Sequence, residues 1–314
     1  MKMIDFARES MGLPESLPCE LVPLAMRGSD RSFFRFIWNK KDSAILVHYD
    51  PKRIENSYYA DISLFLHSVG VPVPRLIRHD RNDCLILMED VGKADLWSFK
   101  DAPWEMRRRL YQKTLRIVHR LHSIPEDGFP AQQVRLMESF GPDLYLWERE
   151  YFREHFVSGV CGIEYEMPLK GELEAELSAL AERLEGTKGA LVHRDLQSQN
   201  VMIRNEEPFL IDFQGMRFGS PFYDLGSLLY DPYVDFTDSE VEELLSFYYN
   251  ISKQNLNWPA FLGYFWEAAA QRLMQALGAY GFLGLTKGLT AFLVHIPAAL
   301  SNLHRAASHV TLLP

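Results

Sequence analysis

The sequence predicts an α+β fold in two lobes, and three features support that prediction. Short β-rich runs separated by turn-forming residues fill the first ninety residues, whereas apolar residues recur at helical spacing through most of the remainder. With 314 residues, the chain is also long enough to divide its core between two compact parts. We therefore expect a small antiparallel-sheet lobe over residues 1–90 and a larger, mostly helical lobe over residues 91–314.

Three β-rich runs open the small lobe. They are ELVPLAM at 20–26, FFRFIW at 33–38 and AILVHY at 44–49, and the stretches between them, RGSDRS and NKKDS, consist of turn-forming residues. Because short strands joined by such turns usually pair with each other, the pattern predicts consecutive hairpins of an antiparallel sheet.

One helix is predicted in this lobe, over about residues 56–69. One face of it carries the apolar residues Tyr58, Ile62, Phe65, Leu66 and Val69. Gly70 and the VPVP segment end the helix, because proline cannot continue its hydrogen-bond ladder. The runs RLIRHD and CLILMED then flank a turn at 81–83 and complete a sheet of about five strands.

Helical periodicity dominates after the segment MEDVG. Apolar spacing predicts helices over 106–121 and 173–184, and Gly186 suits the end of the second one. Thr237 and Glu240 form a capping box at the start of a further helix.

The last helices are predicted over 259–280 and 289–307, where two long stretches are apolar; the second contains Pro297. Inside the helical lobe, ALVHRD, NVMI and PFLIDF form an island of short strands. The segment between the first two of these strands carries the strongest chemical signal, which is described below.

Charge and cysteine content exclude several classes of protein. The 33 basic and 42 acidic residues give a formal net charge of −9, which disfavours binding to nucleic acid. Cys19, Cys84 and Cys161 lack the spacing of a zinc or redox site, so we expect buried thiols in a reducing compartment. The N-terminus lacks a signal-peptide pattern and no stretch is long enough to span a membrane, which favours a cytoplasmic protein without a membrane partner.

The stretch LVHRDLQSQNVMI, followed by PFLIDF, matches the pattern of a phosphotransferase catalytic loop. Asn200 and Asp212 provide the oxygen ligands that Mg²⁺ on ATP phosphates requires. Asp195 can then orient an acceptor hydroxyl and take its proton as the phosphoryl group is transferred. A surface loop with chance polarity is the alternative, but three positions at fixed spacing argue against it.

Three further residues near this loop are assigned structural roles. His193 and Arg194 are expected to hold the loop by hydrogen bonds, because the chemistry needs neither a proton shuttle nor an extra cation there. Asp224 follows a turn and opens a helix in GSPFYDLGSLLYD. It therefore either braces the catalytic loop or simply caps that helix.

The nucleotide contacts are predicted from two weaker patterns. In RGSDRS, Gly28 and the hydroxyls of Ser29 and Ser32 lie between two strands, where they can cover phosphates, although by itself such a stretch is only a hairpin turn. LMEDVG would then be the hinge, whose main-chain groups from Glu89 to Val91 meet the adenine edge.

Taken together, these motifs resemble the aminoglycoside phosphotransferase and choline kinase-like family over most of the chain. LVHRDLQSQNVMI, PFLIDFQG and PFYDLGSLL carry the resemblance, with GVPVPRL and LMEDVG in support. It implies a bilobal protein-kinase-like fold, the cofactors ATP and Mg²⁺, Asp195 as the catalytic base, and Asn200 and Asp212 as metal ligands.

Three longer stretches are similar to bacterial anomeric kinases of amino sugars, which phosphorylate N-acetylmuramate and N-acetylglucosamine for cell-wall recycling. They are GSDRSFFRF, IDFQGMRFGSPFYDLGSLLYDPYVD and AAAQRLMQALGAYGFLG. This second resemblance implies an amino sugar as the acceptor.

The small lobe departs from the kinase pattern at the phosphate-binding lysine. The third strand usually carries this lysine, but AILVHYD places Val47 or His48 there. The helix that should supply its glutamate partner has Tyr58 and Tyr59 near that position, with Asp61 close by. The usual ion pair is therefore absent or rebuilt.

We expect Arg31, or another cation of RGSDRS, to replace the lysine in binding the nucleotide; the alternative is that Arg31 is solvated at the surface. The usual Asp-Phe-Gly is also altered, to Asp212-Phe213-Gln214. Gln214 is therefore expected to add a polar contact near the metal.

The acceptor is predicted to be a small molecule, because the path from Asp212 to Asp224 is too short for the activation segment of a protein kinase. Trp147 is a candidate for stacking on a sugar and Arg272 for binding a carboxylate or amide, although helical periodicity also suits both to packing. Two other functions stay open: a kinase for a cationic acceptor such as an aminoglycoside or choline, and a nucleotide-binding pseudokinase scaffold. The sequence does not determine the phosphorylated hydroxyl, the preference for ATP or GTP, or the oligomeric state.

Overall fold

The computed structural model describes residues 3–24, 31–39, 41–164, 169–187, 189–253 and 255–310. The chain divides into two compact units, which are named here for their content. The β-rich unit consists of Met1–Ala94, Pro130–Met137 and Met202–Gly215, and the helical unit consists of Asp95–Phe129, Glu138–Val201 and Met216–Pro314. Pro130–Met137 and Met202–Gly215 thus pack with the first part of the chain. The predicted lobes, over 1–90 and 91–314, did not include these two segments in the first lobe.

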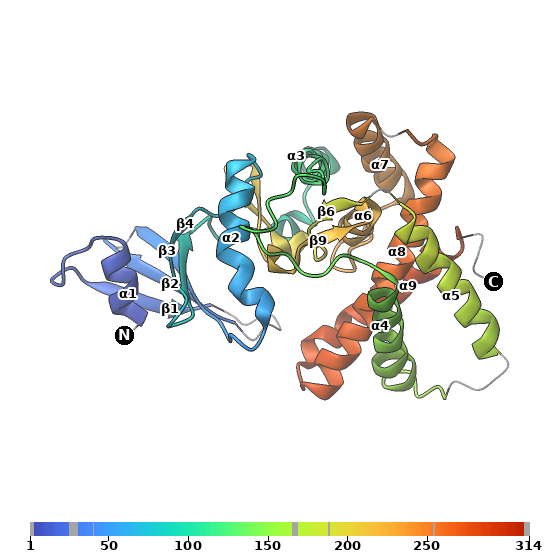
Figure 1. Ribbon diagram of the computed structural model, residues 1–314, viewed down its shortest axis with the longest axis horizontal. Coiled ribbons are helices and arrows are strands. Elements are labelled where there is room, and N and C mark those ends of the chain that lie inside the picture. The colour runs from blue at the N-terminus through green and yellow to red at the C-terminus, as the bar shows by residue number, and fades with distance from the viewer. Residues whose placement is uncertain are drawn as a thin grey trace. The chain divides into compact units, whose positions relative to one another are not determined.

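One antiparallel sheet of five strands forms the centre of the β-rich unit (Figure 1). Its strands lie in the order β1-β2-β3-β5-β4. They are β1 (Cys19–Pro23), β2 (Ser32–Trp38), β3 (Asp42–His48), β4 (Leu76–Asp80) and β5 (Leu85–Glu89). The consecutive hairpins predicted for the first three runs are confirmed, and so is the strand pair across the turn at 81–83.

Two helices cover opposite faces of this sheet (Figure 1). α1 (Met3–Ser10) packs Phe6 onto the face that carries Leu46. Successive strand residues point to opposite faces, so Val47 projects to the other side, where α2 (Ile54–Ser68) lies. α2 confirms the helix predicted over 56–69, whereas α1 was not predicted, because eight residues give barely two turns of periodicity.

A hairpin from later in the chain completes the β-rich unit. The main-chain N–H of Leu210 donates to the carbonyl oxygen of Pro72 at 2.9 Å, which joins the hairpin to the segment after α2. Asp212 lies just beyond this hydrogen bond and therefore belongs to the β-rich unit. The elements are β7 (Val201–Arg204), β8 (Glu207–Leu210) and the 3₁₀ helix η4 (Phe213–Gly215).

The helical unit is built around α8 (Trp258–Gly281), a long and largely buried helix that packs against α4, α6 and α9 (Figure 1). A Cβ at Gly226 of α6 would lie 2.8 Å from the Cα of Ala269 in α8, so glycine permits this close packing. The other helices are η1 (Leu96–Phe99), α3 (Trp104–His122), α4 (Pro142–Phe152), η2 (Arg153–Ser158), α5 (Leu169–Glu185), η3 (Ser198–Asn200), α6 (Pro221–Leu229), α7 (Asp238–Ser252), η5 (Phe282–Thr286), η6 (Thr290–His295) and α9 (Ile296–Ala307). A two-stranded pair, β6 (Ala190–Val192) with β9 (Arg217–Gly219), carries the catalytic-loop motif.

Two sequence predictions about helix ends have opposite outcomes. The capping box is confirmed, since the Glu240 N–H donates to Thr237 Oγ1 at 3.3 Å and the Thr237 N–H donates to Glu240 Oε2 at 2.9 Å. The single helix predicted over 289–307 is wrong. The segment divides into the 3₁₀ helix η6 and then α9, because Pro297 is tolerated only in the first turn of a helix.

The prediction of three buried thiols is also corrected. Cys161 is exposed, and Cys19 and Cys84 are half-buried; all three are free. Small apolar residues take the core positions instead, as Ala7 and Ala44 do under the sheet. Across the described part of the chain, no helix combines the length and the apolar character that crossing a membrane requires.

Candidate active site

Asp224 holds the loop after β6 through hydrogen bonds to the backbone of the loop. The carboxylate of Asp224 accepts hydrogen bonds from the main-chain N–H groups of His193 at 2.7 Å and Arg194 at 2.8 Å. It also lies 3.0 Å from Nε2 of His122, whose Nδ1 lies 2.8 Å from the Tyr248 hydroxyl. Asp224 is fully buried, so of its two predicted roles the structure supports bracing of the loop.

The far end of the same loop is held by Asp231. Its carboxylate accepts hydrogen bonds from the main-chain N–H and the hydroxyl of Ser198, at 2.7 and 2.6 Å. Asn200 closes the loop, since its side-chain Nδ2 donates to the carbonyl oxygen of Asp195 at 2.8 Å. This bond uses the amide nitrogen of Asn200 and leaves its amide oxygen available to a ligand.

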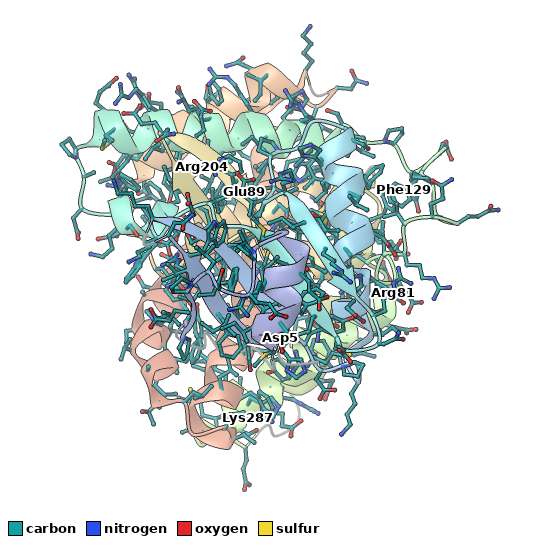
Figure 2. All side chains as sticks on the ribbon, turned by 90° about the vertical axis from the view of Figure 1, so that its left-hand side faces the viewer. Asp5, Arg81, Glu89, Phe129, Arg204 and Lys287 are labelled. Carbon is teal, nitrogen blue, oxygen red and sulfur yellow. The ribbon has the colours of Figure 1, made fainter. Side chains whose placement is uncertain are left out.

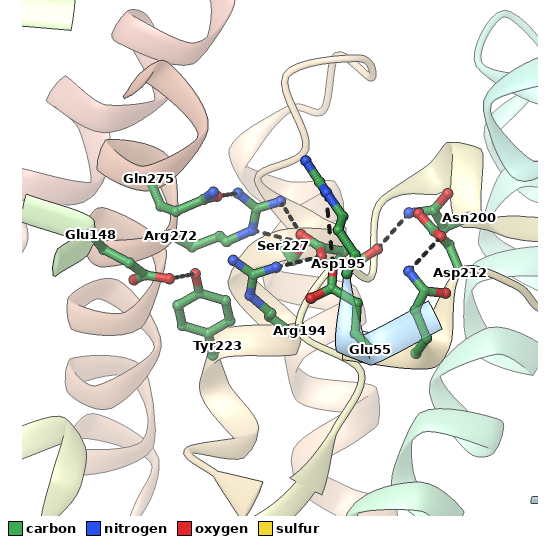
Figure 3. A network of polar contacts seen from close by, with 12 residues as sticks. Glu55, Glu148, Arg194, Asp195, Asn200, Asp212, Tyr223, Ser227, Arg272 and Gln275 are labelled. Carbon is green, nitrogen blue, oxygen red and sulfur yellow. Dashed lines mark hydrogen bonds and ion pairs between the residues drawn. The ribbon is translucent and has the colours of Figure 1, made fainter. Parts of the chain in front are cut away.

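The carboxylate of Asp195 is paired with two guanidinium groups (Figure 3). Arg194 Nη1 lies 3.1 Å from Asp195 Oδ2, and Arg272 Nη2 lies 3.4 Å from Oδ1. Burial alone would raise the pKa of Asp195, but Arg194 and Arg272 outweigh it, so the pKa is lowered from its ordinary value. The side chain is still 31% exposed, so the carboxylate is ionised and accessible at neutral pH.

Arg272 reaches Asp195 from the centre of α8. Its Nε donates to the hydroxyl of Ser227 at 3.2 Å, and its Nη1 donates to the side-chain oxygen of Gln275 (Figure 3). Because Arg272 is itself buried, these partners fix the direction of its guanidinium group. Arg217 adds a further positive charge that lowers the pKa of Asp195.

Asp212, the other predicted acidic residue, lies in the β-rich unit at the turn after β8. The carboxylate of Asp212 is paired with the guanidinium group of Arg31. Gln214 lies against both residues: it accepts a hydrogen bond from Arg31 Nη1 at 2.8 Å and donates one to Asp212 Oδ1 at 2.9 Å. Gln214 therefore makes polar contacts with Arg31 and Asp212, whereas its place near a metal stays a prediction. The structure does not support a solvated Arg31, whose side chain is 11% exposed.

Two residues of the predicted site have backbone conformations that side-chain-bearing residues rarely adopt. Arg194 has a φ of 76° and Asp212 a φ of 63°, both in the left-handed region. Such conformations persist only where the surroundings enforce them, and they gather at functional sites. At Arg194 this constraint is the hydrogen bond that its main-chain N–H donates to Asp224, and at Asp212 it is the hydrogen bond that Oδ1 accepts from Gln214.

Of the remaining residues predicted to contact the nucleotide, some lie outside the described residues and the others belong to the sheet or to the segment after β5. Gly28 and Ser29 lie outside the described residues, and Ser32 opens β2. The Glu89 carboxylate accepts a hydrogen bond from Arg204 at 2.7 Å (Figure 2), and the Glu89 main-chain N–H donates to the Arg75 carbonyl at 2.9 Å. The predicted hinge role of this segment, through the buried Val91, stays a prediction.

Trp147, the candidate acceptor-binding residue on α4, has different surroundings from Arg272. Trp147 is 48% exposed and stacks on Tyr151, one helical turn away, with ring centroids 5.0 Å apart. Its neighbour Glu148 is fully buried and accepts hydrogen bonds from the Tyr223 hydroxyl at 2.8 Å and from Gln271 at 3.0 Å. The structure therefore places Arg272 beside Asp195, whereas the ring partner of Trp147 is Tyr151, which is not a neighbour of Asp195 in any of these contacts.

Sequence reasoning did not find two of the braces. Asp231 lies just beyond the end of α6 (Pro221–Leu229), which contains Asp224, and no helical spacing in the sequence marks it as a second brace. His122 carries no signal either, because its partner Asp224 is 102 residues away. Only the fold brings these two side chains together.

These observations define a class of protein. A β-rich unit with one five-stranded antiparallel sheet, a mostly helical unit, and a braced Asp-Asn loop between short strands are the parts of an ATP-dependent phosphotransferase with a protein-kinase-like fold. The chain belongs to the phosphotransferase enzyme family, whose pattern matches residues 21–279.

Two relatives are both named N-acetylmuramate/N-acetylglucosamine kinase. The protein from Pseudomonas aeruginosa is 24% identical over 254 residues, which are 78% of this chain and 69% of the relative. The protein from Neisseria meningitidis is 22% identical over 282 residues, which are 88% and 82% of the two chains.

Solved structures confirm the predicted fold class. A choline/ethanolamine kinase family protein from Mesorhizobium loti has a TM-score of 0.63 at 16% identity, covering 98% of this chain and 94% of that one. The streptomycin–ATP ternary complex of an aminoglycoside phosphotransferase, APH(2")-IIa, has a TM-score of 0.61 at 16% identity and covers 90% of each chain. At these identities the likeness establishes the fold and not the acceptor.

Proposed function

We propose that this protein transfers the γ-phosphoryl group of ATP, with Mg²⁺, to a hydroxyl of an amino sugar of the N-acetylmuramate or N-acetylglucosamine type. The observation that carries this proposal is the accessible, ionised carboxylate of Asp195 between Arg194 and Arg272. The names of the relatives from two genera support the amino-sugar acceptor. The three free cysteines agree with the reducing cytoplasm, where we place the reaction.

The proposed role of Asp195 is to hold the acceptor hydroxyl and receive its proton. Phosphoryl transfer proceeds through a loose transition state, so the proton leaves late and orientation of the hydroxyl matters most. A carboxylate with a lowered pKa suits this role, because it stays ionised and ready to accept a hydrogen bond at neutral pH. Each Asp195 oxygen has a second lone pair, so the hydroxyl can bind while the arginines stay in place.

The proposed metal ligands are Asn200 and Asp212. The amide nitrogen of Asn200 is occupied by Asp195, which leaves its oxygen, and Asp212 is 33% exposed, with its arginine and glutamine contacts on Oδ1. These two hard oxygen donors fit Mg²⁺, which takes few protein ligands and completes its shell with phosphate oxygens and water. When bound, Mg²⁺ would neutralise charge on the β- and γ-phosphates.

The charge around Asp195 favours a neutral or acidic acceptor over a cationic one. Three guanidinium groups, from Arg194, Arg217 and Arg272, act on this one carboxylate. Glu148 also interacts with Arg194 and Arg272, but it is fully buried and accepts hydrogen bonds from Tyr223 and Gln271, so its carboxylate is not open to a cationic acceptor. An aminoglycoside or choline would meet net positive charge here, at a cost in binding free energy.

An assay of ADP release tests this proposal with four acceptors: N-acetylmuramate, N-acetylglucosamine, kanamycin and choline. We expect turnover with one or both sugars and none above the acceptor-free rate with the two cations. Turnover with kanamycin or choline alone would overturn the acceptor class. Thermal stabilisation by ATP without turnover of any acceptor would instead favour a nucleotide-binding scaffold.

A further inference from the structure

The β-rich unit has no lysine where kinases of this fold use one for the nucleotide phosphates. On β3, Val47 is buried and His48 is exposed, so neither offers a cation beneath the sheet. Val47 instead lines a cavity of about 10 Å³ together with Arg31, Tyr59 and Met88. Arg31 therefore occupies the region that a strand lysine would otherwise fill.

The helix packed on this side of the sheet does not supply a carboxylate at the expected place. Tyr59 of α2 stacks on Phe213, with ring centroids 4.5 Å apart, and its hydroxyl donates to the sulfur of Met88 at 3.0 Å. Burial raises the pKa of Tyr59, so the phenol is neutral. The carboxylates of α2 pair elsewhere, Asp61 with Arg81 at 2.8 Å and Glu55 with Arg53 at 3.9 Å.

Gln214 takes the place of that carboxylate as a partner of the cation. It is buried, and both ends of its amide are used, because the oxygen accepts from Arg31 and the nitrogen donates to Asp212. The ring of Phe33 supports the same guanidinium group from a distance of 5.4 Å. The direction of Arg31 is thus set by contacts from β2 and from the turn after β8.

The neutrality of Gln214 has a physical consequence. A glutamate would hold an arginine and cancel its charge, whereas an amide holds it and leaves the charge for another anion. Asp212 neutralises the charge of Arg31 in this structure, but the proposed function assigns Asp212 to the metal. Once Asp212 binds a metal, the Gln214 contact is able to keep Arg31 in place for a phosphate.

We propose that Arg31 binds the phosphates of the nucleotide and that Gln214 is the residue that positions Arg31 for this contact. The pair replaces the strand lysine and helix glutamate of the fold. This inference rests on the proposed role of Asp212 as a metal ligand, and it adds a positioning residue that the sequence pattern did not assign. Gln214 acts through Arg31, so its removal should have no effect once Arg31 is gone.

Binding of ADP and adenosine, measured by titration calorimetry with Mg²⁺, tests the pair in three variants: Arg31→Met, Gln214→Met and the double variant. Losing a charge-assisted contact to phosphate should weaken ADP binding at least ~10-fold in Arg31→Met. Gln214→Met should weaken it by about 3- to 10-fold, since the arginine remains but is no longer oriented. Adenosine, which has no phosphate, should keep its affinity within about 2-fold in every variant.

The double variant gives the decisive comparison. If Gln214 works through Arg31, the double variant binds ADP as Arg31→Met does; if the two residues act separately, their effects multiply and the proposal is overturned. Equal losses for ADP and adenosine would also overturn it, because they indicate a general disturbance of the unit. The matched control is Arg35→Met, on the same strand, which removes a similarly buried pair with Asp90 (2.6 Å) and should leave the ratio of ADP to adenosine affinity unchanged.

Asp212→Asn separates this inference from the proposed function beneath it. If Asp212 is a metal ligand, this variant should lose the enhancement of ADP binding by Mg²⁺, and in EDTA it should bind ADP at least as tightly as the native protein does, because Arg31 is no longer neutralised by Asp212. If that expectation fails while the Arg31 and Gln214 results hold, the metal assignment is wrong. If Gln214→Met binds ADP as the native protein does, the positioning role is wrong.

Discussion

The loop that carries Asp195 and the turn that carries Asp212 are two solutions to the same problem, which is to fix a partly exposed carboxylate beside arginine. In the helical unit, the Asp195 loop is fixed through its backbone by the buried acids Asp224 and Asp231. In the β-rich unit, the Asp212 turn is fixed through side chains, by Arg31 and Gln214.

This difference indicates which part of the site is rigid and which part is adjustable. A backbone held by buried carboxylates changes only if the surrounding core opens, so the Asp195 geometry is built into the fold. A side-chain triad can exchange one partner for a ligand without moving the chain. We infer that the acceptor side is preorganised and that the nucleotide side exchanges partners when it is loaded.

The largest expected effect comes from Asp195→Asn. Because the amide is isosteric but cannot take the proton, turnover should fall about 100-fold or more while ADP affinity stays within about 2-fold. Steady-state ADP release and calorimetry measure the two quantities. Turnover close to that of the native protein would remove Asp195 from the mechanism, and a parallel loss of ADP affinity would assign it to nucleotide binding.

Breaking the brace of the loop should cost stability. Asp224→Ala leaves the main-chain N–H groups of His193 and Arg194 buried without their acceptor, so the free energy of unfolding should fall by about 3 kcal/mol. Urea unfolding measures this loss. Asp238→Ala, at an exposed aspartate of α7, is the control and should change it by less than about 0.5 kcal/mol. A loss in Asp224→Ala as small as that of the control would show that these two hydrogen bonds do not brace the loop.

The second brace should make stability depend on pH. Burial raises the pKa of Asp231 to about 6 from an ordinary value of 3.8. The folded state therefore binds the proton more tightly than the unfolded state, and this contribution to stability is present below about pH 4 and lost as the pH rises through about 6. Asp231→Asn cannot titrate. Its free energy of unfolding, relative to the native protein, should therefore rise between pH 4 and 7; a constant difference would contradict the raised pKa.

The smallest effect is expected at Trp147. Its ring is 48% exposed and stacks on Tyr151, so Trp147→Ala should cost at most about 1 kcal/mol of stability. The Michaelis constant for the acceptor should stay within about 2-fold, because the ring partner of Trp147 is not a residue of the Asp195 group. If that constant instead rises by about 10-fold or more while kcat is unchanged, Trp147 is restored as a sugar-stacking residue.

The sequence predicted the local parts of this protein well. Strand runs, turn residues and helical spacing gave the five-stranded sheet and most of the helices, because each of these patterns is set by neighbours within a few residues. It failed for α1, which is short, and for the segment 289–307, where Pro297 starts a helix instead of lying inside one.

The candidate site was predictable where its residues are close in sequence. Asp195, Asn200 and Asp212 were found by their spacing, and the Arg31 contact with Gln214 was anticipated only as two separate polar residues. The support of the loop was not predictable, since His122 and Asp224 are 102 residues apart. No local pattern records a contact of that kind.

The sequence alone thus determined the class of chemistry, through one run of residues whose spacing fits a phosphoryl group and its metal. The tertiary structure decided the electrostatic environment of that chemistry. It determined which arginines surround Asp195 and that Gln214 holds Arg31 beside Asp212. The physical reason is range. Turn and helix preferences act between neighbours along the chain, whereas burial and charge act between any groups that folding brings within a few ångströms.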